Sequence, residues 1–413
     1  MRKTIRSLWL KLTWAFNPGT IKEAYRARIK NFFLHWFPPK VTKRSFSWSY
    51  SFWLGTISAV LFLITLVTGV ILMFIYIPST VRAYWSIEDI EFITHYGWLL
   101  RYSHRWAGHL MVVVVFLHMM RVFYTAAYRE TPGRDSHRYV NWVVGVILLL
   151  ATLFLAFTGY LLPWDQLSMW AVTVATGIGR TTPIVGETLY RMLVGGTTID
   201  QETLIRFYTF HCIAVPLVVI LLISYHLWRI RKDGGLASTV HYDVPLDEPI
   251  SEAEDTMRVL AVPAVPRRVF LVTIATWIVV LIATLLFRAP LLEPATQAWT
   301  PNPAKAPWYF LWLQELISFT TIKIGHFVVN GGFVGGVFIP GVLFIVLAVW
   351  PFLDNSPPDS TGIWFHRTRL WQNVLFTIIC LTIVFLILFS YYCRGPYWHV
   401  YWPWNRPEIP GRF

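Results

Sequence analysis

The sequence predicts an all-α integral membrane protein with seven transmembrane helices. Of its 413 residues, 55% are hydrophobic and only 14% are charged, and the mean hydropathy is +0.51. Soluble domains carry about 25% charged residues, so this composition indicates a chain that lies largely within a bilayer. The 22 tryptophans and 19 tyrosines suit the aromatic belts that membrane proteins place at both interfaces.

Seven apolar stretches are long enough to cross a hydrocarbon core of about 30 Å as helices. Basic residues gather in the connections after the second, fourth and sixth stretches, whereas the first connection carries Glu88, Asp89 and Glu91. Positive connections stay on the cytoplasmic side, so we expect a cytoplasmic N-terminus and a C-terminus on the outer, periplasmic side. The stretches cover residues 51–77, 96–125, 140–162, 206–230, 269–288, 325–350 and 372–393.

Residues 1–47 are expected to form a basic amphipathic segment on the cytoplasmic membrane surface. The first 44 residues contain eleven Lys or Arg and one acid, Glu23, with aromatic side chains between them. This pattern is typical of an interfacial helix on anionic lipid. We therefore expect the formal charge of +13 to favour binding to membrane lipid and not to nucleic acid. We expect no cleavable signal peptide in so polar a segment.

The second and fourth stretches each carry a pair of histidines at nearly the same spacing. His104 and His118 are fourteen residues apart, and His211 and His226 are fifteen apart. Fourteen helical residues rise about 21 Å in nearly four whole turns, so the two histidines of a pair share one face. Two antiparallel helices would then set His104 level with His211 and His118 level with His226. Facing imidazoles at two levels predict two six-coordinate haems, although a single intramembrane histidine can instead be a packing residue or part of a proton path.

Two glycine pairs repeat the fourteen-residue step of the first histidine pair. Gly55 and Gly69 lie on the first stretch, and Gly145 and Gly159 lie on the third. Because glycine has no Cβ, a flat macrocycle could lie against the backbone at these positions. Small residues also serve ordinary helix packing in membranes, but two pairs in register with the histidines favour haem binding.

The chain divides at a polar, Pro-containing stretch with an acidic run from Asp243 to Asp255. The outer loops 163–205 and 289–324 are long enough to be functional. The predicted parts are a basic segment (1–47), a four-helix dihaem domain (48–232), a cytoplasmic linker (233–267), a three-helix domain (268–393) and an outer aromatic tail (394–413).

Several motifs resemble cytochrome b of the Rieske/cytochrome b (bc-type) quinol oxidising complexes. Besides the glycine pairs, they are Gly97-Trp-Leu-Leu-Arg-Tyr-Ser-His-Arg-Trp106, Thr158-Gly-Tyr-Leu-Leu-Pro-Trp-Asp-Gln166 and Arg206-Phe-Tyr-Thr-Phe-His211. The first 232 residues are most similar to the chloroplast-type form, which shares the fifteen-residue histidine step. Residues 269–413 resemble the separate three-helix subunit IV of that form more loosely. The chain thus looks like a cytochrome b fused to subunit IV, in a bacterial cytoplasmic (inner) membrane.

The resemblance implies roles for the histidines and for four arginines. His104 and His211 would ligate the iron of a low-potential b-type haem near the quinol oxidising site, and His118 and His226 that of a second b-type haem near the quinone reducing site. Arginines at membrane depth need an anionic partner such as a haem propionate; snorkelling at a helix end is the alternative. The arginines at the matching positions are Arg101, Arg105, Arg121 and Arg206.

The resemblance also places an oxidising pocket between the loop that contains Asp165 and a wall formed by Trp308 and Tyr309. The family motif of that wall is Pro-Glu-Trp-Tyr, and here Pro307 occupies the position of its Glu. Another group must then receive the quinol protons. The candidates are Asp165, Glu315, which could instead be an interfacial charge, and His326, which could instead be a packing residue of the sixth helix.

A second departure from the chloroplast-type form concerns its extra covalent haem. Trp53 occupies the position of the cysteine that attaches that haem, so we expect a quinone pocket there and no third haem. The cysteines of this chain form no CxxC or CxxCH pattern, which argues against c-type haem, zinc or iron–sulfur ligation. They are Cys212, Cys380 and Cys393.

We therefore expect the cytochrome b subunit of a respiratory-chain quinol oxidoreductase, with menaquinone or ubiquinone as substrate. Electrons would pass from quinol near the outer face through two haems to quinone near the cytoplasmic face. A Rieske iron–sulfur protein, a c-type cytochrome or other acceptor subunit, and a second copy of the complex are the implied partners. One alternative is a dihaem membrane anchor for another redox module, such as a nitrate-reductase-like enzyme. A second is a transporter with a histidine proton relay.

Overall fold

The computed structural model describes residues 18, 20–30, 40–129, 136–233, 235–236, 258–357 and 360–405. Within these ranges, seven helical segments are long and apolar enough to span a membrane, in agreement with the predicted fold class. Most of the basic N-terminal segment and the acidic run from Asp243 to Asp255 lie outside the described residues, so the roles assigned to them stay predictions.

The first four spans contain the four histidines. The first three are continuous helices, and the fourth contains a π-helical turn that carries His211. This wider turn lies just before Pro216, whose ring nitrogen has no hydrogen to donate to the helical ladder. The spans are α5 (Leu54–Met73), α7 (Gly97–Tyr124), α8 (Arg138–Leu161) and the run of α11 (Gln201–Thr209), η3 (Phe210–Ala214) and α12 (Val215–Lys232).

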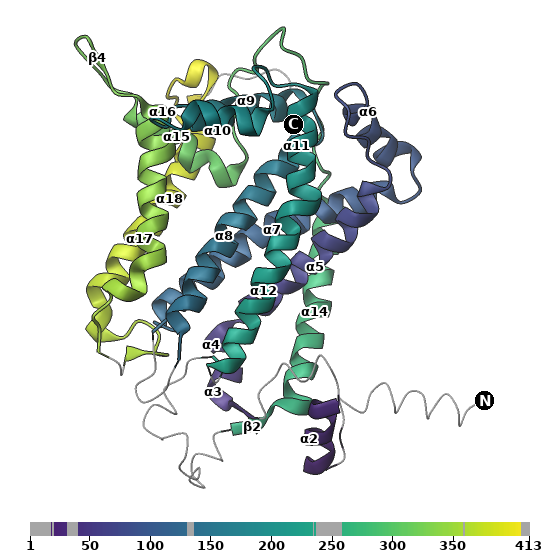
Figure 1. The fold of residues 1–413 in the computed structure, drawn as a ribbon, viewed down its shortest axis with the longest axis vertical. Coiled ribbons are helices and arrows are strands. Elements are labelled where there is room, and N and C mark those ends of the chain that lie inside the picture. Colours follow the sequence, from purple (N-terminus) through teal and green to yellow (C-terminus); the bar gives the residue numbers. More distant parts are fainter. Residues whose placement is uncertain are drawn as a thin grey trace.

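The last three spans follow the stretch that connects the two groups of helices. They are α14 (Ala261–Leu286), the run of α16 (Gly331–Phe333), η6 (Val334–Phe338) and α17 (Ile339–Leu353), and the run of η8 (Arg367–Arg369) and α18 (Leu370–Cys393). In space, α5 packs on α7, α12 on α8, and α17 on α8, while α14 lies against both α5 and α7 (Figure 1).

The sixth span begins at Gly331, six residues later than the sequence suggested. The residues before it form a small hairpin, β3 (Lys323–Ile324) and β4 (Phe327–Val328), which projects from the molecule in Figure 1. His326 lies exposed at the turn of this hairpin, next to Gly325 with a φ of +59°. The prediction that His326 belongs to the sixth helix is therefore wrong.

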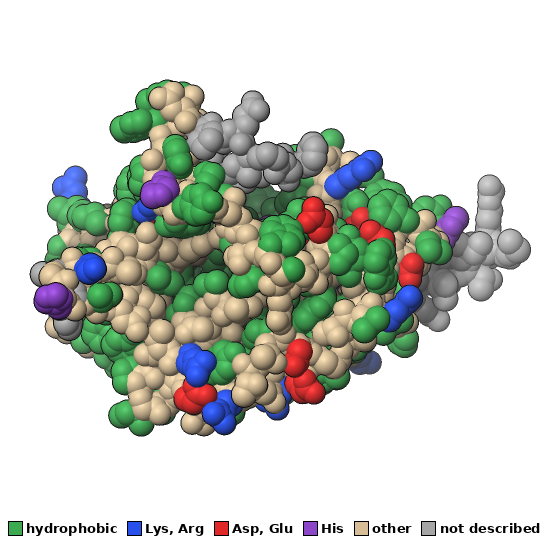
Figure 2. Space-filling view, turned by 90° about the horizontal axis from the view of Figure 1, so that it is seen from above, with side chains coloured by type: hydrophobic (Ala, Val, Ile, Leu, Met, Phe, Trp, Pro, Cys, Tyr) green, Lys and Arg blue, Asp and Glu red, His purple; other side chains and the backbone are tan. Residues whose placement is uncertain are grey.

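Short helices cover the upper end of the molecule in Figure 1, which we call the upper end. One of them, α9, lies within the predicted loop 163–205. In the space-filling view of this end, charged side chains lie mostly toward the edge and uncharged ones toward the centre (Figure 2). The helices are α6 (Ala83–Glu88), η2 (Asp89–Ile93), α9 (Gln166–Arg180), α10 (Gly186–Val194), η5 (Trp308–Phe310), α15 (Leu311–Thr320), η9 (Pro396–Trp398) and η10 (Pro403–Asn405).

At the opposite, lower end, the chain before the first span pairs with the chain before the fifth. Strand β1 (Lys40–Thr42) lies antiparallel to β2 (Arg258–Leu260), with Val41 opposite Val259. The other elements at this end are α2 (Ile21–Lys30), α3 (Lys43–Phe46) and α4 (Trp48–Ser51). In α2, which lies within the predicted basic segment, Thr20 and Glu23 exchange two hydrogen bonds of 3.2 Å as an N-terminal capping box.

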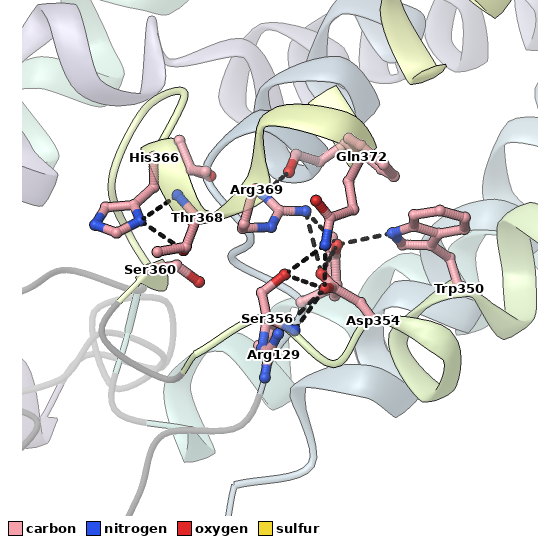
Figure 3. A network of polar contacts seen from close by, with 12 residues as sticks. Arg129, Trp350, Asp354, Ser356, Ser360, His366, Thr368, Arg369 and Gln372 are labelled. Atoms are coloured by element: carbon pink, nitrogen blue, oxygen red, sulfur yellow. Dashed lines mark hydrogen bonds and ion pairs between the residues drawn. The ribbon is translucent and has the colours of Figure 1, made fainter. Parts of the chain in front are cut away.

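A buried polar cluster at the lower end joins the first four spans to the last three (Figure 3). Asp354, which follows α17, accepts hydrogen bonds from Tyr128 at 2.6 Å and from Arg129 at 3.2 Å, both of which follow α7. It also accepts a hydrogen bond from Arg369 at 3.2 Å, and Arg369 donates a further one to Tyr128 at 2.6 Å. Buried charges are stable only when they are paired and hydrogen-bonded, and here the partners come from the chain after α7 and from η8.

Candidate functional site

The four histidines form two facing pairs. The ring centroids of His104 and His211 are 6.0 Å apart, and those of His118 and His226 are 6.4 Å apart. His104, near the start of α7, thus faces His211, near the start of the fourth span, and His118 faces His226 farther along both spans. This pairing requires the two helices to run in the same direction. Their connection through the single span α8 agrees, since two spans separated by one other span cross the membrane in the same direction. The expectation of an antiparallel pair is wrong, although the predicted levels are those observed.

The spacing of each pair fits one haem iron between two imidazoles. Imidazole nitrogens bind such metals at about 2 Å, so the centroids of two rings on opposite sides of one metal lie roughly 6 Å apart. At the upper level, His211 Nδ1 lies 3.0 Å from the carbonyl oxygen of Leu155, and His104 Nδ1 lies 3.0 Å from Thr68 Oγ1. Histidine ligands commonly use one nitrogen in this way and leave the other for the metal.

The lower level contains buried polar atoms that fit an anionic group. Among the described residues, His118 Nδ1 and both Nε and Nη1 of Arg121 are buried without a hydrogen-bond partner. Arg121 is only 4% exposed. A guanidinium with two unsatisfied nitrogens at this depth calls for an acceptor such as a propionate. Arg105 likewise has an Nε atom without a partner in the described part of the chain.

Each of the four predicted glycines faces one of the four histidines. A Cβ built on Gly69 would lie 3.0 Å from Cε1 of His104, and one on Gly55 would lie 3.2 Å from Cε1 of His118. On α8, Gly159 faces His211 so closely that a Cβ would overlap the ring, whereas Gly145 leaves 3.7 Å to His226. The glycines therefore leave room for the imidazoles, and the contact of a macrocycle with them stays a prediction.

Two of the four predicted arginines already have protein partners. Arg101 forms an ion pair with Glu91 and donates to the carbonyl oxygens of Ala289 and Pro290 at 3.1 and 3.0 Å. Arg206 is exposed and donates to the carbonyl oxygen of Met192. These contacts hold loops of the upper end, whereas Arg121 and Arg105 have the unpartnered nitrogens described above; the propionate contacts of all four arginines stay predictions.

The turn that contains Asp165 and Gln166 fastens the loop after α14. Asp165 accepts a hydrogen bond from the backbone of Ser168 at 2.9 Å, as the N-cap of α9, and another from the backbone of Leu292 at 3.2 Å. Gln166 receives the backbone N–H of Thr296 and donates to the carbonyl oxygen of Trp299, both at 2.6 Å. Both oxygens of Asp165 are therefore engaged, and the proton-accepting role expected from the sequence has no support in this geometry.

Trp308 and Tyr309 lie at one end of an apolar cavity of about 260 Å³. Its walls come from α7 and α8 on one side and α17 and α18 on the other, with Trp312 at the same end as the other two aromatic residues. Burial raises the pKa of Tyr309 to about 12, although the charge of Arg105 opposes this. The phenol of Tyr309 therefore stays protonated at neutral pH and can donate a hydrogen bond but not accept a proton.

Comparison with known proteins agrees with this geometry. The family model Cytochrome b/b6/petB matches residues 41–234. Cytochrome b6 of Porphyra purpurea is 40% identical over 181 residues, which cover 44% of this chain and 81% of that protein. Cytochrome b6 of Cyanidium caldarium is 37% identical over 180 residues and is covered to the same extents. The chain belongs to the cytochrome b/b6 family.

A solved structure extends the similarity to nearly the whole chain. A chain of the "Hyperthermophilic respiratory Complex III" superposes with a TM-score of 0.72 at 25% identity and covers 92% of this chain and 91% of its own. This b6-type cytochrome b therefore carries an extra C-terminal region, as the resemblance to a fused subunit IV predicts. Membership of the family implies b-type haem and makes the chain an electron-transfer component of an oxidoreductase.

In this cytochrome b, two candidates remain for the proton-accepting role of the missing Glu: Glu315, which is paired with another residue, and His326, which lies on the hairpin. Glu315 is fully buried and pairs with Arg394 at 2.6 Å, so it is not an exposed interfacial charge. His326 is at the exposed hairpin turn. Trp53 packs against Phe46 with ring centroids 5.7 Å apart, and the absence of a third haem stays a prediction.

The sequence interpretation missed one residue of this cytochrome b that contacts the predicted wall. His109 lies on α7, and its Nδ1 accepts a hydrogen bond of 3.0 Å from Nε1 of Trp308. It stands five residues after His104, off the face that the haem-level histidines share. The only signal in the sequence is an additional histidine on an apolar helix, which gives no partner.

Proposed function

We propose that this chain is the dihaem cytochrome b of a bc-type quinol:acceptor oxidoreductase. In this proposal, quinol is oxidised at the upper, outer end, and electrons cross the membrane through two b-type haems to quinone at the lower, cytoplasmic end. The observation that carries the proposal is the presence of two facing histidine pairs, with centroids 6.0 and 6.4 Å apart, at two levels of one helical bundle.

His104 and His211 would hold the upper haem, and His118 and His226 the lower one. Each b-type haem, when bound, supplies a one-electron carrier whose potential depends on its ligands and surroundings. The contacts of Leu155 and Thr68 hold the upper imidazoles in orientation. At the lower level, the buried guanidinium of Arg121 would neutralise a propionate.

The cavity behind Trp308 and Tyr309 would receive the quinol. Its walls are almost entirely apolar, which suits the isoprenoid tail of menaquinone or ubiquinone. The ring would lie near the aromatic end, where the protonated Tyr309 can donate a hydrogen bond. The hydrogen bonds of Asp165 and Gln166 to the loop between α14 and η5 would hold that loop over this end of the cavity and exclude water.

The oxidising reaction needs a second electron acceptor, and we assign it to a partner. A Rieske iron–sulfur protein is the partner that the family resemblance and the Complex III neighbour support. A c-type cytochrome or other acceptor subunit would follow it, and the complex would be a homodimer. The basic connections support a cytoplasmic N-terminus and a C-terminus on the periplasmic side of a bacterial inner membrane.

The decisive experiment is purification of the native complex from membranes, followed by two measurements. A reduced-minus-oxidised spectrum with quantitative haem extraction should give two b-type haems per chain. Steady-state assays should then show quinol oxidation coupled to reduction of a high-potential acceptor. A polypeptide with one haem or none, or a dihaem complex that does not oxidise quinol, would refute the proposal.

Pro307 favours a second candidate, a dihaem anchor that exchanges electrons between quinone and another redox module. Without the Glu of the family motif, and with Asp165 and Glu315 engaged elsewhere, the upper pocket has lost the usual proton acceptor. The subunit list of the purified complex separates the two candidates. A copurifying Rieske protein supports quinol oxidation, and a molybdenum oxidoreductase in its place supports the anchor.

A further inference from the structure

The backbone bonds at the wall of the proposed quinol pocket are local: the N–H of Ala306 donates to Gln314 at 2.9 Å, and the carbonyl oxygen of Tyr309 accepts from Trp312 at 3.0 Å. Trp308 and Tyr309 lie on η5, a single turn of three residues that follows Pro307. The hydroxyl group of Tyr309 reaches the carbonyl oxygen of Ala156 only at 3.4 Å, near the limit for a hydrogen bond. These local bonds do not join the wall to α7 or α8, so the placement of its two aromatic rings against those helices depends on side-chain contacts.

The strongest of these contacts in the described part of the chain is made by His109. Nε1 of Trp308 donates to its Nδ1 at 3.0 Å. The imidazole also lies edge-on against Tyr309, with ring centroids 5.7 Å apart, and beside Trp106 at 5.4 Å. One side chain on a rigid membrane helix thus contacts both aromatic residues of the wall.

The chemistry of the two rings fixes the protonation state of this contact. An indole N–H can only donate a hydrogen bond, so Nδ1 of His109 must be an unprotonated acceptor and Nε2 must carry the proton. In the imidazolium form both nitrogens carry hydrogens, and the contact with Trp308 is lost. The groups that face the imidazole are Arg105, one turn earlier on α7, and the phenol of Tyr309 from η5.

We propose that His109 is a positioning residue for quinol oxidation, which holds the Trp308–Tyr309 wall in place only while its imidazole is neutral. This inference rests on the proposed function, because it assigns the wall to the quinol pocket. It makes quinol binding depend on pH through a residue that does not itself line the cavity. The consequence is weaker quinol binding whenever His109 becomes protonated.

The test compares three variants of the purified complex. His109→Asn keeps an acceptor near the position of Nδ1 but cannot titrate; His109→Leu removes the acceptor, and Trp308→Phe removes the donor. For each, KM and kcat for a short-chain quinol and the equilibrium Kd of a quinone-analogue inhibitor are measured over a range of pH. Haem content and the redox spectrum of each variant verify that the bundle is intact.

We expect His109→Leu and Trp308→Phe to raise KM and inhibitor Kd by roughly threefold to tenfold at neutral pH, with kcat less affected, since one net hydrogen bond is lost. His109→Asn should keep the wild-type KM at neutral pH. The wild type should bind quinol more weakly as the pH falls, and His109→Asn should lose this dependence. Because the Asn variant retains the contact, it keeps the proposal testable even if His109→Leu does not assemble.

Two results would overturn the inference. One is an unchanged KM and inhibitor Kd in His109→Leu or Trp308→Phe, and the other is a pH profile that is the same in the wild type and in His109→Asn. Neither result would contradict the proposed function if the wild-type complex still oxidises quinol. A wild-type complex that contains both haems but does not oxidise quinol would instead refute the proposed function.

Discussion

Arg394 holds the carboxylate of Glu315 through two of its nitrogens. Nη2 lies 2.6 Å from Oε1, and Nε lies 3.0 Å from Oε1 and 3.2 Å from Oε2. This pair fastens α15, the helix that follows the Trp308–Tyr309 wall, to the chain beyond α18. The geometry is the bidentate one in which arginine binds carboxylates most strongly.

Removal of one partner of this pair should destabilise the protein. Glu315→Ala leaves the guanidinium of Arg394 buried without its counter-charge, which costs about 3–5 kcal/mol in comparable cases. We expect a lower Tm in detergent, measured by loss of helical circular dichroism. Ser318→Ala is the matched control, because Ser318 makes a single contact of 3.3 Å with the same arginine. If Glu315→Ala unfolds like the wild type but oxidises quinol more slowly, Glu315 is a proton acceptor after all.

Substitution of one histidine of a pair should remove one haem and leave the other. His118→Ala takes a ligand from the lower level only, so the amplitude of the reduced b-type absorption band should fall by about half while the upper pair is retained. His104→Ala should remove the other half. The control is His326→Ala, which changes an exposed histidine at the hairpin turn and should leave the spectrum unchanged. A full spectrum in either ligand variant would contradict the assignment.

The glycines that face the histidines should differ in their tolerance of a methyl group. Gly159→Ala would push a Cβ into the ring of His211, whereas Gly145→Ala leaves an ordinary contact of 3.7 Å to His226. We expect Gly159→Ala to lower the occupancy of the upper haem and Gly145→Ala to retain both haems. Extracted haem per polypeptide measures this. Gly341→Ala, with nothing within 4 Å of its Cβ, controls for general effects of the substitution, and equal haem loss in all three would contradict the prediction.

The Asp354 cluster should make stability depend on pH in the acid range. Burial opposes ionisation of Asp354, but hydrogen bonds from Ser356 and Tyr128 and the charge of Arg369 outweigh it, so its pKa lies below the usual value. A lowered folded-state pKa adds stability above the unfolded-state pKa of about 3.9, and this stability is lost as the pH falls through the folded-state pKa.

Asp354→Asn should therefore lower Tm at pH 6–7, and the difference from the wild type should shrink as the pH falls below about 4. Thermal unfolding of both proteins across this range tests the prediction. His366→Ala is the control, because His366 is half-buried and its ring bonds to Thr368 and not to Asp354 (Figure 3). A difference between wild type and Asp354→Asn that is constant with pH would show that the carboxylate adds no proton-linked stability.

The spans and the histidine levels could be predicted from the sequence because both depend on helical periodicity. Hydrophobic length sets where a helix crosses a membrane, and a fourteen-residue step sets two side chains on one face. The length of an apolar stretch and the spacing of two residues on a helix are local, so both can be read without knowing which residues contact one another in the fold. The assignment of the sixth span to residues 325–350 failed at its start because periodicity does not show where a short hairpin ends.

The contacts of the charged residues could not be predicted in the same way. Arg101 and Arg121 look alike in the sequence, but Arg101 meets Glu91 and two carbonyl oxygens, while two nitrogens of the buried Arg121 find no partner among the residues that the structure describes. Glu315 finds its partner 79 residues along the chain. Such partners depend on how loops pack in three dimensions, and His109 was missed for the same reason.

The pairing of β1 with β2 bears on why one polypeptide contains both groups of spans. Three residue pairs there, the bond of 2.7 Å from Trp142 Nε1 to the carbonyl oxygen of Leu347, and the Asp354 cluster already hold the two groups together. We therefore expect the two groups to associate even without a continuous peptide between them. What a single open reading frame adds is stoichiometry, since every ribosome that completes the first group also synthesises one copy of the second.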